Sequence, residues 1–155
     1  MGRRLLFEAF SDSEDETIRF GERLGASLRS RAVIGLTGPL GAGKTRMAQG
    51  IARGAGYSGR VRSPSFALMH LYRGRLPVRH FDFYRLDSID EGTAGEWEEM
   101  LEQDGLSLIE WADRLPEIVP ADAITIDLEP RGESARRIRM RIPLPTGAIG
   151  DWRLR

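Results

Sequence analysis

The sequence contains no cysteine, one lysine and two histidines among its 155 residues. Without cysteine, a disulfide framework, a thiol nucleophile and a cysteine-based metal site are excluded, and two histidines do not complete a zinc site. No uncharged apolar run approaches the ~18 residues of a transmembrane helix, and the N-terminus lacks the apolar core of a signal peptide. Acidic and basic residues balance at 23 each, so no overall field attracts the chain to nucleic acid or a membrane. We expect a cytoplasmic protein with no membrane partner.

The single lysine lies in the octapeptide GPLGAGKT, residues 38–45, which fits the phosphate-binding P-loop pattern G-x-x-x-x-G-K-[ST]. A chance match in a chain of this composition has a probability of roughly one in a thousand. An apolar run over residues 32–37 predicts the preceding strand, and apolar spacing over residues 45–53 predicts the following helix. The guanine-reading motif N-K-x-D needs a second lysine, so the pattern favours ATP over GTP.

Each residue of this motif has an expected role. Lys44 would reach the β and γ phosphates, and the Thr45 hydroxyl would ligate Mg²⁺. Backbone amides at the start of the helix would form an anion-binding nest, where the helix dipole also favours negative charge. The amides of the nest belong to Gly41, Ala42, Gly43, Lys44 and Thr45.

The order of expected strands and helices along the rest of the chain predicts an α/β fold. We expect a P-loop NTPase-like three-layer sandwich whose mixed sheet is parallel at its centre. One domain over residues 1–142 is expected, with a Gly/Pro-bearing tail, residues 143–155, that is loosely ordered. Capping-box patterns predict helices that begin at Ser11 and at Thr93. Strands other than 32–37 are expected over residues 5–10, 66–72, 78–84, 106–109, 123–128 and 136–142.

Hydrolysis also needs an acidic group near Mg²⁺ or the attacking water, and two carboxylates are candidates. Glu110 ends an apolar strand, the position of a Walker-B acid, although an ordinary strand-ending glutamate would look the same. Asp82 alternates with His80 and Tyr84 on one strand face, which indicates either a held carboxylate or a solvated sheet face.

Two further patterns allow more than one interpretation. Ser63-Pro64-Ser65-Phe66 follows the P-loop helix, where P-loop switches often carry a phosphate-sensing hydroxyl, but it also fits a simple turn. Arg137, Arg139 and Arg141 alternate with apolar residues. They fit a solvated strand face, or a patch that touches tRNA or an acidic partner.

In order and spacing, four segments resemble the bacterial TsaE (YjeE) family: the octapeptide, SPSF at residues 63–66, HFDFYRL at 80–86 and LIEW at 108–111. The resemblance spans about residues 5–142. It implies a small ATPase of the tRNA threonylcarbamoyladenosine pathway that uses ATP and Mg²⁺. It also implies action with the TsaB–TsaD complex, whose turnover ATP hydrolysis supports, with tRNA contacted indirectly through that complex.

The resemblance also implies roles for individual residues. Lys44, Asp82 and Glu110 would be catalytic, with Mg²⁺ held by Thr45 and Glu110 and with Asp82 near the metal or water. Nucleotide contacts beyond the loop would come from Ser11, Thr17, Trp111 and Arg136. The chain departs from the family at Ser65, usually threonine, where a switch-like hydroxyl remains, and at Ala112, usually proline.

Two other functions fit the same P-loop. A small-molecule kinase would need an arginine-bearing lid over the phosphates, for which Arg60 and Arg62 are the only hint. A nucleotide-gated scaffold would bind ATP without turning it over.

Overall fold

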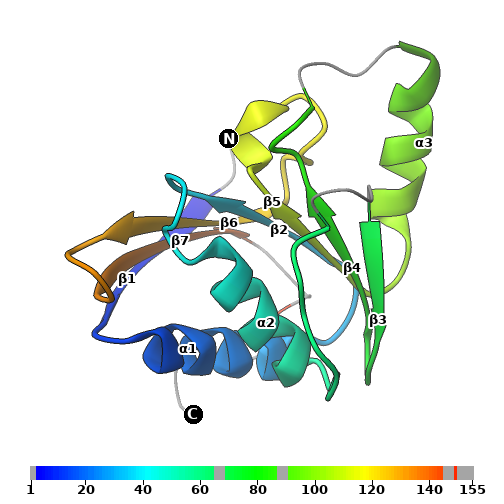
Figure 1. Cartoon of the computed structure of the whole chain (residues 1–155). Coiled ribbons are helices and arrows are strands. Elements are labelled where there is room, and N and C mark those ends of the chain that lie inside the picture. Colours follow the sequence, from blue (N-terminus) through cyan, green and yellow to red (C-terminus); the bar gives the residue numbers. More distant parts are fainter. Residues whose placement is uncertain (1–2, 65–68, 87–90, 145–148, 150–155) are drawn as a thin grey trace.

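The computed structural model describes residues 3–64, 69–86, 91–144 and 149. One mixed sheet of seven strands runs through this part of the chain, in the order β1-β7-β6-β2-β5-β4-β3 (Figure 1). Strands β6, β2, β5 and β4 are parallel, and β1, β7 and β3 pair antiparallel at the two sides. The strands are β1 (Arg3–Ser11), β2 (Ala32–Thr37), β3 (Met69–Arg73), β4 (Pro77–Asp82), β5 (Leu106–Glu110), β6 (Ile124–Pro130) and β7 (Arg136–Leu144).

Helices cover both faces of this sheet. Helices α1 (Glu14–Ser27) and α2 (Lys44–Gly54) lie together on one face, and α3 (Glu91–Glu102) lies on the other with the short 3₁₀ helix η1 (Ala112–Arg114) (Figure 1). The two apolar clusters match these two layers, the larger under α1 and α2 and the smaller under α3 and η1. This confirms the expected three-layer α/β sandwich with a parallel centre. No helix within the described ranges is long and apolar enough to span a bilayer.

Helices α1 and α2 approach closely because glycines line their contact. A Cβ atom added to Gly50 would lie 2.2 Å from the carbonyl oxygen of Ile18, and one added to Gly25 would lie 2.2 Å from that of Ile51. Backbone therefore packs against backbone at this crossing. The crossing fixes α1 against the helix that begins with the single lysine.

Two expected helix starts are wrong. The N-cap of α1 is Ser13, whose hydroxyl accepts a bond from the amide of Glu16 (3.1 Å). Ser11 stays in β1, where it pairs with Arg136, so sheet pairing overrides the local capping pattern there. Helix α3 begins at Glu91, so Thr93 lies in its first turn. Capping-box patterns of four residues also occur inside helices, and the pattern that starts at Thr93 therefore placed the start of α3 two residues too late.

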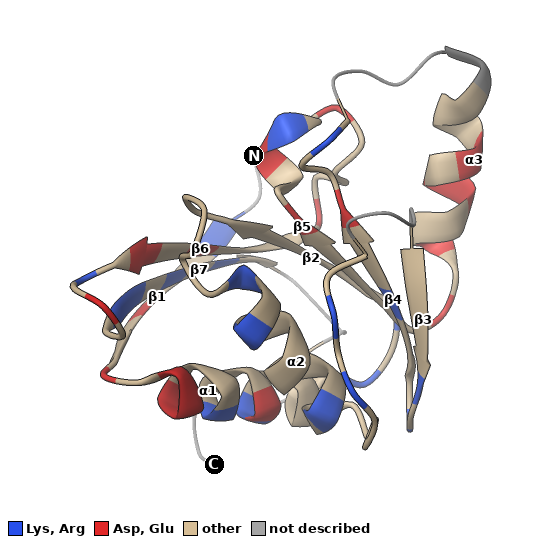
Figure 2. Cartoon of the chain, viewed as in Figure 1, with Lys and Arg blue, Asp and Glu red and all other residues tan. Residues whose placement is uncertain are grey.

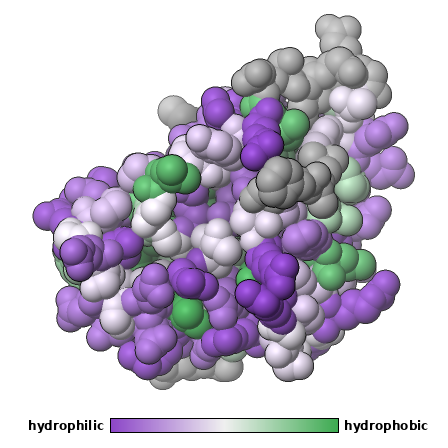
Figure 3. Space-filling model, viewed as in Figure 1, coloured by the Kyte–Doolittle hydropathy of each residue, from purple (hydrophilic) through white to green (hydrophobic). Residues whose placement is uncertain are grey.

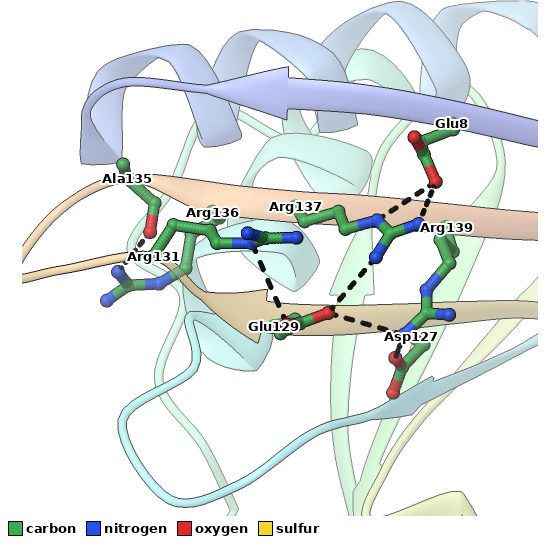
Figure 4. A network of polar contacts seen from close by, with 8 residues as sticks. All are labelled: Glu8, Asp127, Glu129, Arg131, Ala135, Arg136, Arg137 and Arg139. Atoms are coloured by element: carbon green, nitrogen blue, oxygen red, sulfur yellow. Dashed lines mark hydrogen bonds and ion pairs between the residues drawn. The ribbon is translucent and has the colours of Figure 1, made fainter.

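The basic face of β7 carries compensating acids from its neighbours (Figure 2, Figure 4). Arg137 contacts Glu8 of β1 at 2.6 Å, and Arg139 contacts Glu129 and Asp127 of β6 at 3.3 and 3.5 Å. The side-chain hydrogen bond from Arg137 to Glu8 raises the pKa of this guanidinium. Alternating charges of opposite sign favour the solvated strand face over a basic patch for tRNA. The surface in Figure 3 is mostly hydrophilic, with apolar residues in small separate patches.

Candidate functional site

A glycine-rich loop, residues 38–45, connects the end of β2 to the start of α2. Gly38 and Gly43 have φ angles of 137° and 101°, which residues other than glycine rarely adopt. A Cβ atom on Gly38 would also lie 2.4 Å from the carbonyl oxygen of Leu128 in β6. Gly43 is the N-cap of α2 and has no side chain to accept from the first helical amides. These amides and the helix dipole therefore present an anion-binding end to the surface.

The Lys44 side chain is held beside this loop. Its ammonium donates to the carbonyl oxygens of Gly38 (2.7 Å) and Pro39 (2.8 Å) and lies 3.9 Å from the centre of the Trp111 ring. Burial lowers the pKa of this ammonium, while nearby carboxylates, first that of Glu110, raise it. The charge is thus supported by carbonyls, a ring face and carboxylates, all of which a bound anion can supplement or replace.

Glu110 ends β5 and is only 3% exposed. Its Oε1 accepts from the Thr45 hydroxyl (2.8 Å), and its Oε2 lies 2.6 Å from Nε2 of His80. A hydroxyl oxygen and a carboxylate oxygen at hydrogen-bond distance are hard ligands of the kind that Mg²⁺ prefers. Among the described residues, no group of three His, Asp or Glu could hold a metal alone. Mg²⁺ usually takes one or two protein oxygens and completes its shell with phosphates and water.

Asp82 ends the neighbouring strand β4, in register with Glu110. One carboxylate oxygen accepts from the hydroxyl of Ser63, and the other accepts from the amide of Tyr84 (2.9 Å). The side chain is half-buried, so Asp82 is oriented on both sides and still reaches the surface. Ser65, the expected switch-like residue, lies outside the described residues; within them, Ser63 provides the hydroxyl at this position.

The other three residues expected to contact the nucleotide are Ser11, Thr17 and Arg136. Ser11 and Thr17 are buried and bond each other through their hydroxyls (2.7 Å). Arg136 donates from Nε to the carbonyl of Ala42 (2.8 Å) and from Nη2 to that of Gly41 (3.0 Å). None of these three expected contact residues lines the cleft described next. Arg136 therefore bonds two carbonyls of the loop, while Ser11 and Thr17 bond each other.

A cleft of about 520 Å³ lies at this end of the sheet. The loop, both carboxylates and the Trp111 indole share it. It is lined by Glu14, Leu40, Gly41, Ala42, Gly43, Lys44, Thr45, Arg46, Ser63, Asp82, Tyr84, Arg85, Glu110 and Trp111. Tyr84 also lines the cleft, and its ring lies 4.9 Å from that of Trp111. Tyr84 had no expected role of its own, and its alternation with Asp82 in the sequence was the signal that pointed to it.

Trp111 has a left-handed backbone conformation, with φ of 59°, unusual for a residue other than glycine. It is the N-cap of η1 and directly follows Glu110, so the chain turns sharply at the end of β5. The turn brings the indole over Lys44, while the carboxylate before it points to Thr45. Strain at such a position is common at functional sites.

Comparison with known proteins gives consistent results. A sequence model of the TsaE family, described as threonylcarbamoyl adenosine biosynthesis protein TsaE, matches residues 11–138. The chain is 35% identical over 128 residues to the tRNA threonylcarbamoyladenosine biosynthesis protein TsaE of Treponema pallidum, covering 83% of this chain and 95% of that protein. It is 40% identical over 124 residues to the protein of the same name from Mycobacterium leprae, covering 74% and 77%.

A solved structure is similar as well. The crystal structure of Bacillus subtilis YdiB superposes with a TM-score of 0.73 at 29% sequence identity. The match covers 92% of this chain and 87% of YdiB. The likeness therefore extends over the sheet and the helices on both of its faces.

Proposed function

The chain belongs to the TsaE family of tRNA threonylcarbamoyladenosine biosynthesis proteins, and from this premise we propose that it binds ATP with Mg²⁺ and hydrolyses it. One observation carries the proposal. The Thr45 hydroxyl at the start of α2 and the Glu110 carboxylate at the end of β5 meet at 2.8 Å, beside the Lys44 ammonium. This is the arrangement that phosphoryl transfer needs, since its catalysis consists mainly of positioning and charge neutralisation.

Each residue has a defined task in this proposal. The first amides of α2 bind the phosphate chain, and Lys44 exchanges its two loop carbonyls for phosphate oxygens. Thr45 and Glu110 hold Mg²⁺, which neutralises charge on the phosphates when bound. Asp82, fixed by Ser63 and by its own backbone turn, orients the attacking water from the neighbouring strand end.

We propose further that ATP hydrolysis supports turnover of the TsaB–TsaD complex, with tRNA reached only through that complex. Family membership supports this choice of partners. The site itself is consistent with low activity of the isolated protein. Lys44 is held by loop carbonyls, so a partner that closes the cleft would favour its transfer to phosphate.

The proposal is tested with Glu110→Gln, which keeps size and shape and removes the charge. Nucleotide affinity is measured by calorimetry, and phosphate release is measured with TsaB and TsaD present. The variant should still bind ATP and should lose at least about 10²-fold in turnover, the usual effect of removing one electrostatic stabiliser. Glu117→Gln, an exposed glutamate outside the cleft, is the matched control and should behave as wild type. Undiminished turnover in Glu110→Gln would refute the role of this carboxylate.

The same assay separates the other two functions. A kinase would transfer phosphate to an added nucleoside monophosphate and release little of it to water. Arg60 and Arg62 are exposed and do not line the cleft, so the described residues give the kinase no additional support. A scaffold would bind ATP in the assembled complex without any turnover.

A further inference from the structure

A chain of buried polar contacts continues beneath Glu110, away from the cleft. Oε2 of Glu110 lies 2.6 Å from Nε2 of His80, and Nδ1 of His80 lies 3.0 Å from the Tyr72 hydroxyl. The Tyr72 hydroxyl in turn donates to the backbone carbonyl of Arg62 (2.9 Å). The three side chains are 3%, 0% and 4% exposed. They come from β5, β4 and β3, and the carbonyl belongs to the loop before β3.

The direction of these bonds follows from the donors available. A carbonyl can only accept, so the single hydroxyl proton of Tyr72 goes to Arg62. The hydroxyl must then accept from His80, which places a proton on Nδ1. Because two acceptors cannot bond each other, the 2.6 Å contact between Nε2 and Oε2 of Glu110 carries a second proton. The carboxylate therefore cannot rotate without breaking a buried bond, and its other oxygen, Oε1, stays directed at Thr45.

The loop at the far end, residues 58–64, is attached to the other carboxylate as well. Its Arg62 carbonyl accepts from Tyr72, and the hydroxyl of the next residue, Ser63, donates to Asp82. Adjacent residues of one loop thus connect to both acids of the cleft, one through its backbone and one through its side chain. Movement of this loop would release both connections together.

We propose that Tyr72 and His80 are positioning residues that couple the 58–64 loop to the orientation of Glu110. With the loop in place, the chain of contacts holds Oε1 toward Thr45, where the two residues would hold Mg²⁺; with the loop displaced, the carboxylate loses its support. This inference rests on the proposed function, because it assumes that Glu110 is a metal ligand. Partners that orient a metal ligand typically change metal affinity by about 10–100-fold when removed.

A packing role for Tyr72 makes a different prediction. Its ring stacks on that of Tyr57, with centroids 4.7 Å apart, and belongs to the larger apolar cluster. Tyr72→Phe keeps the ring and removes only the hydroxyl, so packing alone predicts little change. Tyr57→Phe is the matched control, because it removes an exposed hydroxyl that bonds a carbonyl of the same loop, that of Arg60, at 3.3 Å.

The experiment measures ATP binding by calorimetry over a range of Mg²⁺ concentrations, in wild type, Tyr72→Phe and Tyr57→Phe. The Mg²⁺ concentration for half-saturation should rise about tenfold in Tyr72→Phe and less than about twofold in Tyr57→Phe. ATP affinity without Mg²⁺ should change less than about twofold in both. Equal Mg²⁺ dependence in the two variants would overturn the proposal.

A second measurement needs no nucleotide. Arg60 and Arg62 are exposed trypsin sites in the loop, so cleavage there reports how firmly the loop is held. Cleavage should be faster in Tyr72→Phe than in Tyr57→Phe; equal rates would overturn the coupling. Wild type that fails to bind ATP at all would overturn the proposed function, whereas the cleavage result stands independently of it.

Combining variants tests whether the contacts act as one chain. His80→Gln keeps a donor near Glu110 and breaks the link to Tyr72. If both substitutions interrupt the same connection, the double variant should show nearly the same Mg²⁺ dependence as the worse single variant. Multiplication of the two fold-changes would overturn the proposal. Should His80→Gln fail to fold, Tyr72→Phe and its control carry the test alone.

Discussion

Replacing Gly50 by alanine adds one methyl group at the point where α2 crosses α1. The added Cβ would lie 2.2 Å from the carbonyl oxygen of Ile18 and 3.0 Å from Cα of Gly21. Both are backbone atoms of α1, so no side chain can rotate away to make room. The helices must separate, and α2 carries the glycine-rich loop at its first turn.

Two effects of opposite sign set the magnitude. Alanine favours a helix over glycine by about 1 kcal/mol. Overpacking of a rigid contact costs about 3 kcal/mol, the upper end of the usual range, because the obstruction is backbone. The free energy of unfolding should therefore fall by about 2 kcal/mol. For a chain of this size the melting temperature should fall by about 4–8 °C.

Gly95→Ala is the control, because Gly95 is an exposed position of α3 with no atom within 4 Å of its added Cβ. The same substitution should raise stability there by about 0.5–1 kcal/mol. Urea unfolding at equilibrium measures both variants against wild type, with the slope m checked for constancy. If Gly50→Ala is as stable as Gly95→Ala at equal m, the result would contradict the close approach of α1 and α2 at Gly50.

Three further predictions concern the site. The Lys44 ammonium lies 3.9 Å from the Trp111 ring centre, so ATP binding should change tryptophan fluorescence, and Trp111→Phe should abolish the change; a persisting change would contradict this assignment. Burial raises the pKa of Tyr72 to about 12. At pH values between 10 and 12 this hydroxyl therefore stays protonated in the folded protein but ionises in the unfolded chain. The Tyr72 hydroxyl should therefore lower the free energy of unfolding by about 2–3 kcal/mol between pH 10 and 12. In urea titrations at each pH, Tyr72→Phe should lack this contribution and show a correspondingly smaller decrease. Arg136→Ala removes donors to two loop carbonyls and should weaken ATP binding about tenfold by calorimetry, whereas Arg141→Ala, exposed on the same strand, should match wild type.

Much of the fold could be read from local patterns. The apolar run 32–37 and the helix after it are local features, and the structure places β2 and α2 there with shifts of at most one residue. Alternation over residues 80–83 correctly separated His80 from Phe81 and Phe83, which lie in the smaller apolar cluster. Capping was less well predicted, because Ser11 and Ser13 present similar patterns and only the pairing of β1 with β7 distinguishes them.

The contacts that form the candidate site are not local. Thr45 and Glu110 are 65 residues apart in sequence, and they meet because β2 and β5 are parallel neighbours with adjacent carboxyl ends. Strand order and register decided this contact, and in the sequence only the family resemblance, not a local pattern, connects Thr45 with Glu110. The same holds for Tyr72, which reads as an ordinary strand aromatic until β3 pairs with β4 and sets its hydroxyl against His80.

By itself, the sequence therefore determined the glycine-rich loop, the periodicity of the strands and helices, and the kinds of residue available for chemistry. Each depends on neighbours within a few positions, through steric limits on glycine and the periods of helix and strand. The tertiary structure alone decided that the Glu110 carboxylate contacts Thr45, which residues support it, and that Arg136 bonds two carbonyls of the loop. These depend on contacts between distant segments, which exist only once burial of both sheet faces has fixed strand order and register.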